Sequence, residues 1–163
     1  MTVTDELLAN SRRYAESFEK GDLPMAPAKK VAVLSCMDAR VIPSRILGLS
    51  EGDAHIIKNA GGVATDDAIR SLAISQHLLG TEEIILIHHT DCGMLTITDE
   101  ELAERLEQTS GQRPEWRAHA FSDVEQDVRD SIKRITESPF IPRTESVRGF
   151  VYDVATAELR EVS

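Results

Sequence analysis

Two short segments of this chain carry side chains that can bind a metal ion or move a proton. In the first segment, Cys36, Asp38 and Arg40 occupy alternate positions, so their side chains point the same way if the chain is extended there. In the second segment, His89 and Cys92 have the His-x-x-Cys spacing of a ligand pair carried by a turn. Both segments follow apolar runs. If those runs form neighbouring parallel strands, we expect the two segments to meet at one edge of the sheet.

A donor set of two thiols and one imidazole matches the ligand preference of Zn²⁺. Zinc binds thiolate and imidazole in tetrahedral geometry, and structural sites usually have four protein ligands. Cys36 and Cys92 are the two cysteines of the chain, so with one histidine the protein offers three ligands. Three protein ligands leave one position open, which is typical of catalytic zinc. Spacing alone leaves two questions open: the histidine could be His88 or His89, and both thiols could simply be small buried side chains.

Other functions of the same residues fit less well. A cysteine-phosphatase loop needs an arginine six residues after the cysteine, and position 42 is Ile42. The Cys-x-x-Cys motif of thioredoxin-like proteins is not found in the sequence. Asp38 and Arg40, taken alone, could also form an ordinary surface ion pair.

Apolar runs that alternate with amphipathic segments predict an α/β fold. Strands are expected at residues 31–36, 54–58, 83–88, 147–154 and 159–162. Helices are expected at residues 4–20, 43–47, 66–79 and 98–108, and from Ser122 to a stop at Pro139. This order favours right-handed βαβ units, and therefore a mainly parallel β-sheet flanked by helices, with an N-terminal helical arm and connector over residues 1–27. Residues 110–121 are expected to be irregular.

Length and charge limit the class of protein. The chain has 163 residues, of which 41% are hydrophobic, so we expect a single domain over residues 1–163 with a sizeable core. Its 28 acidic and 18 basic residues give a net charge of −10, which argues against nucleic acid or an anionic membrane as a partner. No apolar run approaches the roughly 20 residues of a membrane helix, and the N-terminus does not resemble a secretory signal. These features predict a cytoplasmic location, where both cysteines stay reduced.

Four segments carry a set of motifs that occur together in one known family: Cys36-Met-Asp-Ala-Arg40, Lys58-Asn-Ala-Gly-Gly62, His88-His-Thr-Asp-Cys92-Gly93 and Arg148-Gly-Phe-Val-Tyr-Asp153. Together they resemble the β-class carbonic anhydrases. The resemblance covers roughly residues 28–155, and the paired C-x-D-x-R and H-x-x-C-G motifs are specific at this separation. The compact chain is similar to the smaller members of that family.

The resemblance implies a zinc enzyme that hydrates CO₂ reversibly to bicarbonate and a proton through zinc-bound hydroxide. It implies Cys36, His89 and Cys92 as the zinc ligands, with His89 rather than His88 as the histidine. It also implies a catalytic dyad of Asp38 and Arg40. In some members the aspartate displaces the water, so Asp38 is expected as a conditional fourth ligand.

The resemblance also bears on the substrate pocket, partners and alternatives. Gly93 is expected to let the substrate approach closely, and Val63 is a weaker candidate for the wall of the CO₂ pocket. The family forms homodimers, with the N-terminal helix laid across the partner, or tetramers. Two alternative functions remain open: a hydrolase of CS₂ or COS that uses the same zinc site, and a non-catalytic zinc or redox-sensing protein.

Overall fold

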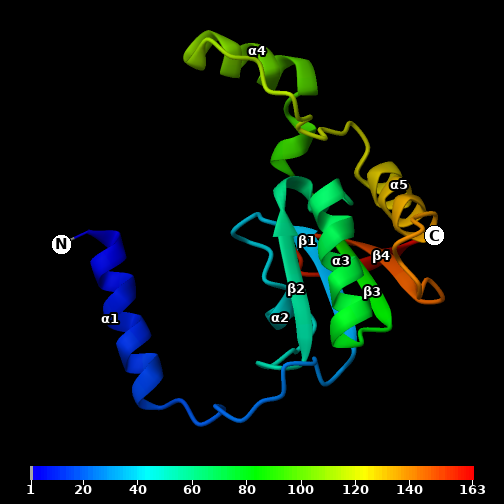
Figure 1. Ribbon diagram of the computed structural model, residues 1–163. Helices are drawn as coiled ribbons and strands as arrows, with labels where there is room; N and C mark the ends of the chain where they lie inside the picture. Colours follow the sequence, from blue (N-terminus) through cyan, green and yellow to red (C-terminus); the bar gives the residue numbers. More distant parts are fainter. Residues whose placement is uncertain (1) are drawn as a thin grey trace.

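A computed structural model describes residues 2–163, and within them five strands form one sheet in the order β2-β1-β3-β4-β5 (Figure 1). The first four strands in that order pair in parallel, and β5 pairs antiparallel with β4. The predicted α/β class and the mainly parallel sheet are therefore confirmed. The strands are β1 (Val31–Cys36), β2 (Ala54–Asn59), β3 (Glu83–His89), β4 (Val147–Tyr152) and β5 (Leu159–Val162).

The helices follow the expected order with shifted ends. The first helix ends at Glu16 rather than at Lys20. The last helix is capped by Asp123 rather than by Ser122, because the Asp123 carboxylate accepts hydrogen bonds from the backbone of Glu125 and Gln126. Residues 111–121 carry bends and irregular backbone, as expected. The helices are α1 (Val3–Glu16), α2 (Pro43–Ile46), α3 (Asp66–Leu79), α4 (Asp99–Ser110) and α5 (Val124–Thr136), with single turns η1 (Ala60–Gly62) and η2 (Gly93–Leu95).

Both faces of the sheet are covered by apolar side chains. On one face, Leu34 and Leu86 pack with Leu72 of α3 and Ile135 of α5. On the other face, the core includes Val33, Ile87 and Val41, with half-buried residues of the α2 region around them. All six residues of β1 are buried, which is why its sequence is an almost unbroken apolar run.

The central place of β1 creates the position for a site. The chain leaves β1 to form β2 on one side and later returns to form β3 on the other side. The carboxyl ends of β1 and β3 therefore lie at the point where the strand order reverses, the usual location of binding sites in open α/β sheets.

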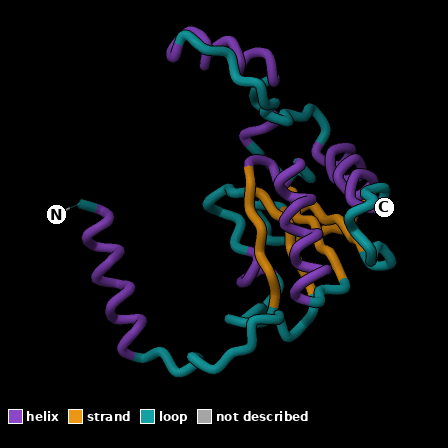
Figure 2. The backbone as a smooth tube through the Cα atoms, viewed as in Figure 1, coloured by secondary structure: helices purple, strands orange, loops and turns teal. Residues whose placement is uncertain are grey.

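The N-terminal helix α1 lies apart from the sheet, at the end of a long connecting segment (Figures 1 and 2). Its base is tied to the body by Glu51, whose carboxylate accepts from the Tyr14 hydroxyl at 2.8 Å and from Lys20 Nζ at 2.7 Å. The predicted N-terminal helix is thus confirmed. Within residues 2–163 no helix combines the length and apolarity needed to cross a membrane.

Candidate metal centre

Three side chains with metal-binding atoms meet at the ends of β1 and β3. Cys36 is the last residue of β1, His89 is the last residue of β3, and Cys92 follows in the next turn. All three are buried, and one ligand atom from each lies within 4.8 Å of the others. The two sulfur atoms are 4.0 Å apart. The convergence expected from the sequence is therefore present, with His89 and not His88 in the cluster.

The orientation of His89 leaves one nitrogen free to bind a ligand. Its Nδ1 donates a hydrogen bond to the carbonyl oxygen of Thr90 at 2.7 Å, which places the proton on Nδ1. Its Nε2 is buried and has no hydrogen-bond partner among the described residues. A buried nitrogen lone pair without a partner is costly, and a metal ion would satisfy it. The cluster therefore fits Zn²⁺ by donor type, burial and orientation.

The two thiols share their protons unequally. The hydrogen bond from Cys92 lowers the pKa of Cys36 to about 4, against the opposing effect of burial. The same contact raises the pKa of Cys92, because a second negative charge next to the first is unfavourable, and burial adds to that effect. The opposite shifts place negative charge on Cys36 before Cys92, and a negative charge at the site favours a cation.

Asp38 and Arg40 form a close ion pair beside the cluster. Arg40 Nε donates to Asp38 Oδ1 at 3.0 Å and Nη2 donates to Oδ2 at 2.9 Å, while the Arg40 backbone N–H donates to Oδ1 at 2.8 Å. These bonds hold the pKa of Asp38 well below its usual range, so the carboxylate is ionised. Asp38 Oδ2 lies 3.8 Å from Nε2 of His89. The carboxylate is nevertheless outside the group of three ligand atoms described above.

A turn, rather than an extended chain, brings Asp38 and Arg40 together. The Val41 N–H donates to the Asp38 carbonyl at 3.0 Å, so the backbone bends after β1. The alternation of Cys36, Asp38 and Arg40 is therefore not the cause of their proximity. The Asp38 carboxylate instead receives the backbone N–H two residues later, a local hydrogen bond that aspartate commonly makes in turns.

The glycine turn after β2 packs directly behind Cys36. Gly62 has φ of +71°, and a Cβ atom added there would lie 2.8 Å from the Cys36 nitrogen and 3.0 Å from the Ser35 carbonyl carbon. A side chain does not fit at this position. Close packing against the backbone of β1 therefore explains the glycine at position 62.

Two residues expected near the substrate occupy different environments. Gly93 begins η2 directly after Cys92, is exposed, and has open space where a side chain would stand. Val63 follows η1 and is 7% exposed, and its carbonyl accepts a hydrogen bond from the Asn59 amide. Their role toward a substrate stays a prediction.

The other histidines lie outside the metal-ligand cluster. His88 is fully buried, and its Nε2 lies 2.7 Å from a carboxylate oxygen of Asp127 on α5. His55 hydrogen-bonds Ser75, and His77 contacts a backbone carbonyl. These are structural contacts of β2, β3 and α3.

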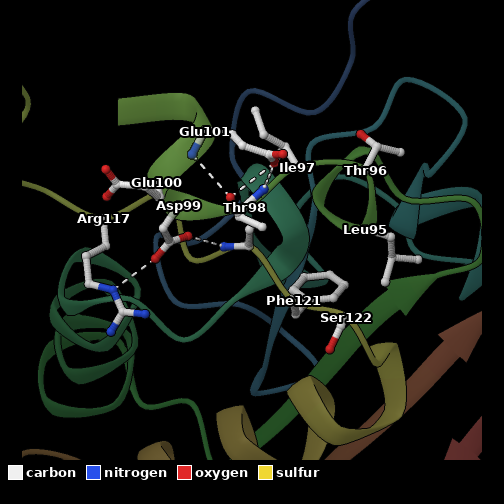
Figure 3. A pocket seen from close by; sticks show the side chains of 11 residues that line it. Leu95, Thr96, Ile97, Thr98, Asp99, Glu100, Glu101, Arg117, Phe121 and Ser122 are labelled. Carbon is white, nitrogen blue, oxygen red and sulfur yellow. Dashed lines mark hydrogen bonds and ion pairs between the residues drawn. The ribbon is translucent and has the colours of Figure 1, made fainter. Parts of the chain in front are cut away.

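A cavity of about 540 Å³ lies between the start of α4 and residues 117–122 (Figure 3). Several of its polar groups are paired with one another or with the backbone. Thr98 and Glu101 form the capping box of α4, and Asp99 accepts from Arg117 at 2.9 Å and from the backbone of Ala120 at 2.7 Å. The cavity is thus built around helix caps, in contrast to the unpartnered nitrogen of the metal centre.

Asp91 is a contact of the site that the sequence analysis missed. Its carboxylate accepts from Arg40 Nη1 at 2.9 Å. The only sequence signal was its place inside the His-x-x-Cys spacing.

Comparison with known proteins agrees with this geometry. The sequence model described as carbonic anhydrase matches residues 31–159. β-Carbonic anhydrase 1 of Mycobacterium tuberculosis is 56% identical over 163 residues, which cover 100% of this chain and 99% of that protein. A carbon disulfide hydrolase of Saccharolobus solfataricus is 35% identical over 159 residues, covering 82% of this chain and 77% of that protein.

Solved structures show the same relationship. The crystal structure of a carbonic anhydrase from Streptococcus mutans superposes with a TM-score of 0.94 at 41% identity, covering 100% of this chain and 99% of that chain. The apo form of a carbon disulfide hydrolase superposes with a TM-score of 0.72 at 34% identity, covering 98% and 90%. With family motifs, full-length similarity and fold in agreement, the chain belongs to the β-class carbonic anhydrases, a family of enzymes.

Proposed function

We propose that the protein hydrates CO₂ reversibly to bicarbonate and a proton, with Zn²⁺ held by Cys36, His89 and Cys92. One observation carries the proposal: the buried Nε2 of His89, unpartnered among the described residues, shares a cluster with two thiols beside the ionised Asp38. Bound at this site, zinc supplies Lewis-acid chemistry, because it lowers the pKa of water and so provides a nucleophile for CO₂.

Asp38 orients the attacking water. Each carboxylate oxygen has two acceptor positions, and Arg40 fills both on Oδ1 but only one on Oδ2. The remaining position is on Oδ2, the oxygen 3.8 Å from His89 Nε2. An ionised carboxylate can only accept hydrogen bonds, so Asp38 accepts one from the water and thereby turns an oxygen lone pair toward carbon.

Arg40 keeps Asp38 ionised and in place. Its planar guanidinium engages both carboxylate oxygens, which a lysine could not do in the same way. Released from Arg40, Asp38 could use the same free position to bind the metal in place of water. We therefore include Asp38 as a conditional fourth ligand.

In this proposal the substrate reaches the site past Gly93 and Val63. Gly93 leaves open space directly after a metal ligand. Val63 supplies an apolar surface, which suits a nonpolar molecule such as CO₂. A cytoplasmic, reducing environment completes the proposal, because it keeps Cys36 and Cys92 as metal-binding thiols.

Stopped-flow CO₂ hydration with a pH indicator, run on purified protein of known zinc content, tests this function. We expect activity with about one zinc per chain, loss of activity after chelation, and recovery when Zn²⁺ is returned. Folded, zinc-loaded protein without CO₂ hydration would contradict the proposal.

CS₂ is the second candidate substrate, because the chain is similar over most of its length to proteins named carbon disulfide hydrolases. The same zinc-loaded sample should be incubated with CS₂ and assayed for H₂S. Release of H₂S without CO₂ hydration would favour the hydrolase. Inactivity toward both substrates would favour a non-catalytic zinc protein.

Self-association is the second part of the proposal. The apolar side chains of α1 are exposed, including Leu7 at 58%. Exposed apolar stripes of this kind mark protein interfaces. We propose that α1 packs on a second copy of the chain, in a homodimer or a tetramer.

A further inference from the structure

Arg40 has a second carboxylate partner, Asp91. In the sequence, Asp91 stands between the metal-ligand residues His89 and Cys92. Asp91 Oδ2 accepts from Arg40 Nη1 at 2.9 Å. The Asp91 carbonyl oxygen also accepts from Arg40 Nη2 at 3.1 Å. One residue therefore contacts the guanidinium through both its side chain and its backbone.

These contacts leave Arg40 little freedom to rotate. A guanidinium has five N–H donors in one plane. Nε and one Nη2 donor hold Asp38, while Nη1 and Nη2 hold Asp91. Because the two partners lie on different edges of the same plane, rotation of Arg40 toward solvent would break bonds to both.

Asp91 makes both contacts from an unusual backbone conformation. Its φ is +55°, a left-handed conformation that aspartate, asparagine and glycine tolerate better than other residues. The residue before it, Thr90, provides the carbonyl that orients His89. Thr90 thus orients His89, and Asp91 holds Arg40 in place.

We infer that Asp91 is a positioning residue, which acts through Arg40 to hold Asp38 in its working orientation. This inference deepens the proposed function and rests on it. Asp91 touches neither substrate nor metal in this scheme. Its effect should therefore fall on kcat and leave KM for CO₂ unchanged.

An ordinary surface ion pair is the competing explanation, since the Asp91 side chain is 77% exposed and that of Arg40 is 47% exposed. Such pairs contribute little to stability. Asp67 and Arg70 form a comparable pair at 2.8 Å on α3, with exposures of 75% and 65%. Asp67→Asn is therefore a matched control that removes an equally exposed carboxylate from another arginine.

Two substitutions at position 91 separate the effect of the negative charge from the effect of the whole side chain. Asp91→Asn keeps an acceptor oxygen and tolerates the left-handed backbone but removes the charge. Asp91→Gly removes the side chain without strain at positive φ. We expect kcat to fall about 10-fold in Asp91→Gly and less in Asp91→Asn, because misplacing a catalytic group costs up to about 100-fold. The Asp67→Asn control should match the wild type.

A double substitution shows whether Asp91 acts through Arg40. If it does, Asp91→Gly should lower kcat in the wild type and have no added effect in the Arg40→Ala background. Zinc content and melting temperature should match the wild type in Asp91→Gly. A crystal structure of that variant should show Arg40 displaced from Asp38, a result that does not depend on activity.

Each other outcome overturns the inference. Wild-type kcat in Asp91→Gly would show a plain surface ion pair. Loss of zinc would show that Asp91 supports the ligand turn instead of Arg40, and additive effects in the double variant would show an independent role. A wild type inactive toward CO₂ would sink the proposed function itself, and the crystal structure would still test the hold on Arg40.

Discussion

At the scale of single residues, the atoms that hold the site in place are as informative as the donor atoms themselves. The Thr90 carbonyl fixes the proton of His89 on Nδ1 and frees Nε2. Arg40 fills three of the four acceptor positions of Asp38 and leaves one on Oδ2. The donor atoms could be predicted from the sequence, but these orientations depend on where the fold places the Thr90 carbonyl and the backbone and side chain of Arg40.

The first prediction concerns the metal ligands. Replacement of Cys92 by alanine leaves one thiol and one imidazole, too few for a stable zinc site. We expect the zinc content of purified Cys92→Ala to fall from about one per chain to near zero, and CO₂ hydration to disappear with it. Zinc analysis by inductively coupled plasma mass spectrometry measures this. His77→Ala, which removes a histidine outside the cluster, should keep its zinc. Full zinc occupancy in Cys92→Ala would refute the ligand assignment.

The second prediction concerns Arg40. Without the guanidinium, Asp38 loses the two side-chain bonds that lower its pKa most and fix its direction, and keeps the bond from the backbone N–H of residue 40. We expect Arg40→Ala to retain zinc while kcat/KM falls by on the order of 100-fold, the cost of misplacing a catalytic group. Arg40→Lys should be intermediate, because lysine offers charge without the planar fork.

The acid side of the pH profile gives a further check on Arg40. The pKa of Asp38 is lowered in the wild type, so the carboxylate stays ionised far into acid. In Arg40→Ala that pKa rises, and protonation sets in at higher pH. The part of kcat/KM that depends on ionised Asp38 should therefore be lost at a higher pH in the variant than in the wild type. Unchanged kcat/KM and an unchanged profile would mean that Arg40 is only a surface charge.

At the scale of elements, the close packing of the η1 turn on the end of β1 allows only glycine at position 62. The η1 turn presses against the end of β1 so closely that a Cβ would stand 2.8 Å from the Cys36 nitrogen. Its φ of +71° adds strain for any other residue. We expect Gly62→Ala to lower the free energy of unfolding by roughly 1–3 kcal/mol, measured by chemical denaturation. It should also weaken zinc binding, because Cys36 must shift.

Gly93 provides the matched control and tests its own predicted role. A Cβ at Gly93 would meet nothing within 4 Å in this chain. Gly93→Ala should therefore keep the stability of the wild type. If Gly93 borders the path of CO₂, KM rises in this variant; an unchanged KM would remove Gly93 from the substrate pocket.

The elements also show where prediction from sequence ends. Strands at 31–36 and 83–88 were predictable because fully buried parallel strands need apolar residues at nearly every position. The contact of Arg40 with Asp91 was not, since it joins residues 51 apart through the pairing of β1 with β3 and a left-handed backbone. The cap of α5 was misplaced by one residue because Ser122 and Asp123 are both good caps, and only the folded backbone chooses between them.

At the scale of the whole molecule, none of the residues of α1 is buried. It stands away from the sheet in Figure 1, and its base is attached through Glu51. Lys20 lowers the pKa of Glu51 to about 2, so this attachment persists at neutral pH. An arm fixed at its base with an exposed apolar side is arranged to cover a second surface, and the proposed self-association supplies one.

The last prediction tests that arrangement. At 18.0 kDa per chain, a dimer has twice this mass, and sedimentation equilibrium should show it or a tetramer for the wild type. Leu7→Asp places a charge on the exposed apolar side of α1 and should shift the protein toward monomer. Nine residues, about two and a half turns, separate Leu7 from Glu16, which therefore lies on the opposite side of the helix. Glu16→Lys should leave the assembly unchanged. Because α1 does not contribute a ligand to the metal cluster, Leu7→Asp should also keep its zinc. Assembly that survives Leu7→Asp would show that α1 is not the interface, and a monomeric wild type would exclude self-association as proposed.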